Sequence, residues 1–359
     1  MGALHFSPDG AIGEMTRLTL EDVGHLAGVS RSTVSRVINK ESSVSAAVRQ
    51  RVEDVIRQTG YTPNAAARSL VSNRTGVIGL VIPSGVHNLF EDPYFARLIQ
   101  GVTTASNRAH ATLSLFLFET QDEENDIYPR VVESGFLDGV IVTATRSGDP
   151  LISRIAASSL PTVIVGRPGI EGVSFVDVDN KGGSRDAARL LCETGCQVVG
   201  CIRAPESTTT GQDRLAGFIE GLADGGRALP TRRIADGDYS ESSGYDGMLQ
   251  LLNEGVDGVF VASDTMALGA LRAIRESGLR VPDDVAVVGF DGFSASESAN
   301  PPLTTLRQPV VQTAAGAVEM LMAEIERQGG EAVSRVLPVE LVIRESTRPA
   351  PSSHSSESA

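Results

Sequence analysis

The first side chains whose types and spacing suit chemistry lie on one short helix near the N-terminus. Arg31, Ser32, Ser35 and Arg36 point outward from the predicted helix 31–38, whose inner face is apolar. Guanidinium and hydroxyl groups donate hydrogen bonds, and arginine forms paired bonds with the edge of guanine. This helix face therefore suits the recognition of DNA bases.

A second helix and a tight turn position that face. The apolar residues of helix 20–27 recur at helical spacing: Leu20, Val23, Leu26 and Ala27. Thr19 caps this helix, Gly28 stops it because glycine adopts left-handed backbone without strain, and Ser30 caps the next helix. Two such helices and a three-residue turn form a helix-turn-helix, whose second helix enters a DNA major groove. Taken alone, the pattern also allows a plain helical hairpin with a solvated arginine face.

The charge distribution agrees with DNA binding by the N-terminal part. The chain has 359 residues and a net charge of −14. Residues 1–75 hold nine basic and seven acidic residues, whereas the rest holds 22 basic and 38 acidic ones. The acidic part repels phosphate, so we expect the protein to dock on DNA through its N-terminal part.

Further boundaries follow from pattern and composition. Residues 1–17 lack periodicity and are predicted to be disordered, and 18–61 form the helix-turn-helix domain, with a third helix at 46–59. Residues 62–74 read as a linker by position, yet Asn64–Leu70 is rich in helix formers, so a short hinge helix is the alternative. Residues 350–359 form a polar, disordered tail.

From residue 75 to 349 the pattern alternates between strands and helices. Predicted strands cover 77–82, 113–118, 138–142, 162–165, 198–202, 258–261 and 285–290. Predicted helices cover 94–109, 128–134, 182–193, 212–222, 243–253 and 266–277. The fold class is thus an all-α headpiece followed by an α/β core with doubly wound parallel sheets, which bind ligands at the carboxyl ends of their strands.

Several signals argue against other functions. Cys192, Cys196 and Cys201 match no zinc spacing and are expected to be free thiols, as in a reducing cytoplasm. Asp177 and Asp179 have no nearby histidine, so structural hydrogen bonding is favoured over acid–base catalysis. The sequence lacks a phosphate loop and a nucleophile elbow, and no apolar run reaches the ~18 residues that span a bilayer. We therefore expect no enzyme, metal, cofactor or membrane contact, and a cytoplasmic protein.

Five motifs mark residues 19–70: A-G-V-S at 27–30, T-V-S-R-V-I-N at 33–39, V-S at 44–45, G-Y-T-P-N at 60–64 and A-R-S-L at 67–70. Together they resemble the DNA-binding headpiece of the LacI/GalR family of bacterial transcription regulators. The resemblance implies DNA contacts from Thr19, Ser30, Arg31, Ser32, Thr33, Ser35, Arg36 and Asn39. It also implies a hinge helix with Asn64, Ala67 and Leu70, in which Leu70 wedges into the minor groove.

The core carries further matching motifs: D-V-D-N-K-G-G at 177–183, D-R-L-A-G-F at 213–218, S-D-T-M-A-L-G-A-L-R-A at 263–273, V-V-G-F-D at 287–291, P-P-L-T-T-L-R-Q at 301–308 and L-P-V-E-L-V-I-R-E-S at 337–346. The resemblance implies two lobes like those of a periplasmic sugar-binding protein. Lobe 1 covers about 75–174 and 303–335, and lobe 2 covers about 175–302 and 336–349. Crossovers are expected near Ser174, Pro302 and Val336.

The resemblance also implies an effector site between the lobes. Arg214 and Asp291 match a charged pair at the cleft, although a purely structural ion pair is the alternative. The other expected contacts are Tyr94, Phe95, Tyr239, Ser263, Thr265 and Phe290. A carboxylate and a guanidinium suit the vicinal hydroxyls of a sugar. One departure is the long loop 84–95, where the match resumes at Asp92 in place of the family's frequent Asn.

The resemblance therefore implies a repressor that binds a pseudo-palindromic operator as a homodimer or tetramer and responds to a sugar-type effector. The sequence lacks a long C-terminal leucine heptad, which disfavours a tetramer held by a terminal helical bundle. A purine- or nucleoside-responsive regulator is the alternative within the class. A sugar-binding receptor or a sugar-processing enzyme is the alternative from another class.

Overall fold

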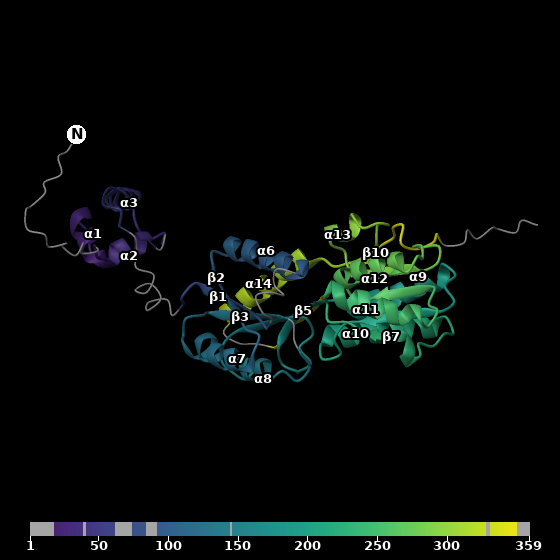
Figure 1. Ribbon diagram of the computed structural model, residues 1–359. Helices are drawn as coiled ribbons and strands as arrows, with labels where there is room; N and C mark the ends of the chain where they lie inside the picture. The colour runs from purple at the N-terminus through teal and green to yellow at the C-terminus, as the bar shows by residue number, and fades with distance from the viewer. Residues whose placement is uncertain are drawn as a thin grey trace, which may run out of the picture. The chain divides into compact units, whose positions relative to one another are not determined.

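The computed structural model describes residues 18–38, 41–61, 74–83, 92–143, 146–327 and 331–349. The chain divides near Thr75 into an N-terminal headpiece and a larger core unit. Figure 1 shows three helices in the headpiece and two sheets flanked by helices in the core. The expected hinge residues Asn64, Ala67 and Leu70, the loop 84–91 and both chain ends lie outside the described residues.

The headpiece consists of α1 (Leu20–Ala27), α2 (Arg31–Ile38) and α3 (Ala46–Thr59). Its small core gathers one apolar face from each helix: Val23, Ala27, Val34, Val37, Val52 and Tyr61. The predicted stripe of α1 was wrong at Leu26, which is 58% exposed. Leu26 lies about 100° of helical rotation from Ala27, so it turns away from the face that Val23 and Ala27 share.

The predicted helix ends are confirmed at the turn between α1 and α2. The Thr19 hydroxyl accepts from the backbone N–H of Asp22, whose carboxylate accepts from the N–H of Thr19. Gly28 has φ +64° and lies in the left-handed region. The Ser30 hydroxyl accepts from the N–H of Thr33 at 3.3 Å. These bonds fix the direction in which α2 leaves the turn.

The first lobe contains a parallel sheet with the strand order β11-β5-β4-β3-β1-β2. Its strands are β1 (Val77–Ile82), β2 (Thr112–Leu117), β3 (Gly139–Thr143), β4 (Thr162–Val165), β5 (Ser174–Val178) and β11 (Ser334–Leu337). α6 (Pro93–Arg108) and α14 (Val310–Arg327) cover one face. α7 (Gln121–Tyr128), a π-helix (Pro129–Glu133) and α8 (Pro150–Ala156) cover the other.

The second lobe contains a sheet with the strand order β12-β10-β9-β8-β6-β7. Its strands are β6 (Val199–Arg203), β7 (Ile234–Asp236), β8 (Gly258–Val261), β9 (Ala286–Asp291), β10 (Thr304–Arg307) and β12 (Glu340–Val342), of which β12 is antiparallel to β10. The flanking helices are α9 (Asn180–Glu193), α10 (Thr209–Asp224), α11 (Glu241–Leu252) and α12 (Asp264–Glu276). Short helices at Thr231–Arg233 and Ser294–Glu297 (α13) complete the lobe.

The lobe boundaries differ from the predicted ones. β5 belongs to the first sheet and β10 to the second, so the chain crosses after Val178, after Arg307 and after Leu337. The expected positions were Ser174, Pro302 and Val336. β5 pairs with β4 and β11, and β10 pairs with β9 and β12. Local periodicity does not reveal which sheet a strand joins.

Two helix predictions also need correction. The predicted helix 128–134 is a helix that begins earlier, at Gln121, and changes to π geometry at Pro129. Proline lacks an N–H and disrupts the regular bonding of an α-helix. The 18-residue helix α14, which packs against α6, was not predicted. No helix in the described part of the chain is long and apolar enough to span a membrane.

Helices α11 and α12 of the second lobe approach each other through glycine. A Cβ atom built on Gly269 would lie 1.9 Å from the carbonyl oxygen of Glu241. One built on Gly244 would lie 1.9 Å from the carbonyl oxygen of Met266. Because these neighbours are backbone atoms, a side chain forces the two helices apart.

We therefore predict that Gly269→Ala lowers the free energy of unfolding by about 1–3 kcal/mol through overpacking, although alanine is the better helix former. Differential scanning calorimetry of the full-length protein measures the effect. Gly316→Ala on α14 is the matched control, because the closest atom to its new methyl group would be the flexible end of the Arg335 side chain, at 3.1 Å, and Val176 would lie at an ordinary contact distance of 3.8 Å. Equal melting temperatures for both variants would contradict the backbone contact.

Candidate functional site

The outward face of α2 carries the expected DNA-binding groups. Arg31, Ser32 and Arg36 are exposed, and Thr33 and Ser35 are half-buried. Arg36 forms only a loose, exposed ion pair with Glu41, at 3.9 Å. Such a pair contributes little to stability, so the guanidinium is free to exchange this carboxylate for DNA.

The remaining expected DNA contacts divide into two groups. The Ser30 hydroxyl lies 2.8 Å from the hydroxyl of Ser32 and 2.9 Å from that of Thr33, so these residues order one another at the start of α2. Thr19 is exposed and caps α1. Asn39 lies outside the described residues, as does the whole expected hinge.

A second polar site lies in the core unit, where strand ends converge. Asp177 is the next-to-last residue of β5, Asp291 is the last residue of β9, and Gln308 directly follows β10. Ser263 follows β8 and caps α12, and Arg214 reaches the same place from α10. Ligands of doubly wound sheets bind at this edge, and we call this group of residues the cleft site.

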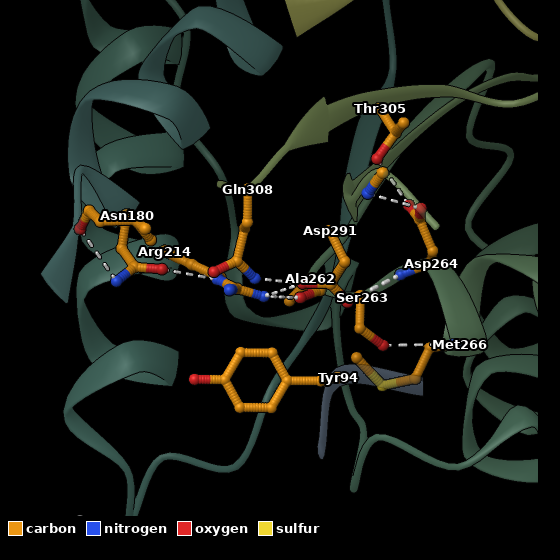
Figure 2. A network of polar contacts seen from close by, with 12 residues as sticks. Tyr94, Asn180, Arg214, Ala262, Ser263, Asp264, Met266, Asp291, Thr305 and Gln308 are labelled. Atoms are coloured by element: carbon orange, nitrogen blue, oxygen red, sulfur yellow. Dashed lines mark hydrogen bonds and ion pairs between the residues drawn. The ribbon is translucent and has the colours of Figure 1, made fainter. Parts of the chain in front are cut away.

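Arg214 is the centre of the cleft site (Figure 2). The residue is only 3% exposed. Its Nε donates to Oδ1 of Asn180 at 2.9 Å, and its Nη1 donates to the carbonyl oxygen of Ala262 at 2.5 Å. Nη1 also lies 3.4 Å from Oδ1 of Asp291, and the guanidinium stacks on the Phe290 ring at 3.6 Å. These bonds engage three of the five N–H groups of the guanidinium, and among the described residues no partner takes the two N–H groups of Nη2, which suit a ligand.

Asp291 is held by neighbours on three sides. Gln308 Nε2 donates to its Oδ1 at 2.5 Å, and the N–H of Asp264 approaches its Oδ2 at 3.4 Å. Asp291 adopts φ +123°, a conformation that favours glycine, so the network holds a strained backbone. Burial raises the pKa of Asp291 to about 8, whereas Arg214 opposes this increase.

Asp264 and Asn180 are functional neighbours that the sequence analysis did not identify. Asp264 accepts from the Thr305 hydroxyl at 2.6 Å and from the N–H of Gly292 at 2.8 Å. Asn180 donates to Asp177 Oδ1 at 3.1 Å while it accepts from Arg214. Both residues stand inside the motifs quoted above, but only the folded chain shows that they orient the charged pair.

The structure places the expected aromatic residues differently. Tyr94 and Tyr239 are half-buried, and both lie within electrostatic range of Arg214 and Asp291. Figure 2 shows the Tyr94 ring beside the network. Phe290 is fully buried beneath Arg214, and Phe95 packs in the core of the first lobe. Both phenylalanines therefore complete apolar packing behind the polar residues, and their expected contact with an effector stays a prediction.

The other expected contacts have local roles as well. The Ser263 hydroxyl accepts from the N–H of Met266 at 3.3 Å and so caps α12, and Thr265 in the first turn is half-buried. The three cysteines are free thiols. Within the described ranges, no cluster of histidine, cysteine and acidic residues is arranged to hold a metal ion.

A helix-turn-helix joined to a two-lobed α/β unit defines a class of protein, the DNA-binding transcription regulators with a periplasmic-binding-protein-like core. A family model described as "Bacterial regulatory proteins, lacI family" matches residues 19–64, and one described as "Periplasmic binding protein-like domain" matches residues 188–347. The transcriptional regulator CelR of Thermobifida fusca is 39% identical over 335 residues, which are 92% of this chain and 98% of the relative. The chain belongs to the lacI family of bacterial regulatory proteins.

Solved structures agree with this family assignment. A transcriptional regulator CelR–cellobiose complex has a TM-score of 0.74 and 37% identity, and the match covers 92% of this chain and 100% of that one. A lac repressor dimer bound to operator and the anti-inducer ONPF has a TM-score of 0.80 and 28% identity, with 93% and 100% coverage. The chain is thus a DNA-binding transcription regulator, as the sequence predicted, and its curated relatives are regulators rather than enzymes.

The raised pKa of Asp291 predicts how stability depends on pH. Asp291 stays protonated in the folded protein up to about pH 8, whereas an aspartate in the unfolded chain loses its proton near pH 4. Between these two pH values the folded state therefore binds more protons than the unfolded state. The free energy of unfolding therefore decreases as the pH rises through this range. Asp291→Asn cannot titrate and should flatten the slope between pH 6.5 and 8 by at most about 1.4 kcal/mol per pH unit.

Urea unfolding of the full-length protein at pH 6.5, 7 and 8, followed by circular dichroism, measures this slope. Asp246→Asn, which changes an exposed carboxylate on α11, should keep the wild-type slope. If Asp291→Asn also keeps it, Arg214 holds Asp291 ionised throughout the range.

Proposed function

We propose that this protein is a dimeric repressor that binds a pseudo-palindromic operator and changes its operator affinity when a sugar occupies the cleft site. The single observation that supports this proposal best is the buried Arg214–Asp291 pair at the strand ends of the core. The pair presents guanidinium N–H groups and carboxylate oxygens to one ligand. Hydroxyl groups both donate and accept, so a sugar satisfies both sides.

Operator recognition is assigned to α2. Arg31, Ser32 and Arg36 are exposed on one face, and a helix of this size fits the major groove. Twofold symmetry of a dimer would place two such helices on two half-sites. In this proposal the segment with Asn64, Ala67 and Leu70 is the hinge helix, and Leu70 opens a central base step in the minor groove.

The cleft site is assigned to a sugar for a further reason. Tyr94 from the first lobe and Tyr239 from the second both lie within electrostatic range of the charged pair. Their rings offer apolar surface for the C–H faces of a sugar, while the charged groups bind its hydroxyls. The related CelR structure contains cellobiose, so cellobiose is the first sugar to test. A ligand between two lobes shifts their arrangement and thereby DNA affinity, by a coupling free energy of typically ~1–3 kcal/mol.

Arg31→Ala tests base recognition. We expect a loss of about 10- to 100-fold in affinity for a duplex that the full-length protein selects from random DNA, because one bidentate base contact disappears. Affinity for unselected DNA should change much less. Fluorescence anisotropy at fixed salt measures both affinities, and Arg57→Ala on α3 removes the same charge as a control. If the variant loses the same amount of affinity for all DNA sequences, Arg31 contacts the phosphate backbone and not a base.

Asp291→Ala tests the cleft site. Isothermal titration calorimetry of the full-length protein with cellobiose should show binding, and the variant should bind about 10- to 100-fold more weakly because a hydrogen-bonding group of the cleft site is lost. The control is Arg280→Met, which removes an exposed ion pair of the second lobe. The same sugar should alter operator affinity of the wild type. If nucleosides bind and sugars do not, the effector is a nucleoside and not a sugar, and the DNA-binding function is unaffected.

A further inference from the structure

The cleft site holds more acidic than basic side chains. Asp92 caps α6 of the first lobe, Asp177 is the next-to-last residue of β5, and Asp291 is the last residue of β9 in the second lobe. All three carboxyl groups interact electrostatically with the single guanidinium of Arg214. Three carboxyl groups from both lobes therefore act on the guanidinium of Arg214 at the place where a ligand would bind.

Two other arginines near the cleft site have partners of their own. Arg167 forms a bidentate pair with Asp213, at 2.9 and 2.7 Å. Arg97 donates to the carbonyl oxygen of Gly292 at 3.5 Å and stacks over the Phe293 ring at 5.1 Å. Asp213 opposes the effect of Arg167 on Asp177, because its carboxylate raises the pKa of Asp177 while the guanidinium lowers it. Arg97 keeps its charge, but its contacts lie at Gly292 and Phe293 and not at Asp92 or Asp177.

Asp92 and Asp177 differ from Asp291 in the groups that donate hydrogen bonds to their carboxyl oxygens. Asp291 receives hydrogen bonds from both Arg214 and Gln308. The bonds to Asp92 and Asp177 come from backbone N–H groups and the Asn180 amide, and all of them reach Oδ1. Within the described part of the chain, Oδ2 of each carboxylate is left as an acceptor. A hydroxyl can donate to such an oxygen, whereas an ionised phosphate offers only acceptors.

We propose that the cleft site selects an uncharged polyhydroxyl ligand and rejects its phosphorylated form, and that Asp92 and Asp177 impose this selection. The proposal rests on the proposed function of the cleft and narrows it to one chemical class. Its physical reason is that like charges repel strongly where few water molecules screen them. Desolvation of a phosphate dianion beside two carboxylates that form no direct ion pair among the described residues adds to the cost.

The test uses matched pairs of neutral and phosphorylated compounds with the full-length protein. The pairs are cellobiose and cellobiose 6-phosphate, glucose and glucose 6-phosphate, ribose and ribose 5-phosphate, and adenosine and its 5′-monophosphate. Calorimetry at pH 7.5 keeps most Asp177 side chains ionised, because burial raises the pKa of this group only to about 6. In the pair that binds, we expect the phosphorylated member to bind at least about 30-fold more weakly.

The double variant Asp92→Asn, Asp177→Asn tests which residues are responsible. Asparagine keeps an acceptor oxygen at each position, and it also caps helices well, so the fold should persist, which a thermal melt verifies. The preference for the neutral member should fall at least about tenfold, because two repulsive charges are removed. Asp284→Asn, which changes a carboxylate at the exposed Arg280 ion pair, should keep the wild-type preference.

The outcomes separate this proposal from the proposed function. Equal or tighter binding of a phosphorylated sugar overturns the selection and leaves a sugar-responsive regulator. An unchanged preference in the double variant overturns the role of Asp92 and Asp177. If adenosine binds and its 5′-monophosphate and the sugars do not, the selection against charge stands and the proposal of a sugar effector is overturned. If no compound of any pair binds, both the selection and the sugar effector are overturned.

Discussion

The core depends on the burial of one guanidinium. Arg214 is 3% exposed and is held by Asn180, the Ala262 carbonyl, Asp291 and the Phe290 ring. A buried cation is costly unless it is paired and hydrogen-bonded, so each partner must come from a fixed place in the fold. Asn180 and Ala262 lie just beyond β5 and β8, and Phe290 and Asp291 end β9, so both sheets must form before the site exists.

The same network joins the two lobes. A chain of hydrogen bonds runs from Asp177, at the end of a strand in the first sheet, through Asn180 and Arg214 to Asp291 in the second. Outside this chain, Arg167 of the first lobe pairs with Asp213, the neighbour of Arg214 on α10. A ligand that binds Arg214 thus acts on a helix that already contacts both lobes. This arrangement provides a physical route by which a small molecule can alter the lobe arrangement.

The headpiece relies on a different constraint. Its three helices bury only a few side chains. The helix caps and the turn therefore do much to fix how the helices are arranged. Thr19, Gly28 and Ser30 set the angle between α1 and α2, and that angle decides which side chains α2 presents. The small core is completed by Val52 and Tyr61, from α3 and the residue beyond its C-cap.

The sequence by itself determined the headpiece almost completely, because caps, glycine stops and helical periodicity are local signals. It also determined the α/β class of the core and the positions of Arg214 and Asp291, through motifs. Only the tertiary structure decided that Asn180 and Asp264 orient this pair and that Phe95 and Phe290 face inward. It also decided where the chain crosses between lobes. These features arise from contacts between segments far apart in sequence, and no local pattern encodes which distant strand a segment will pair with.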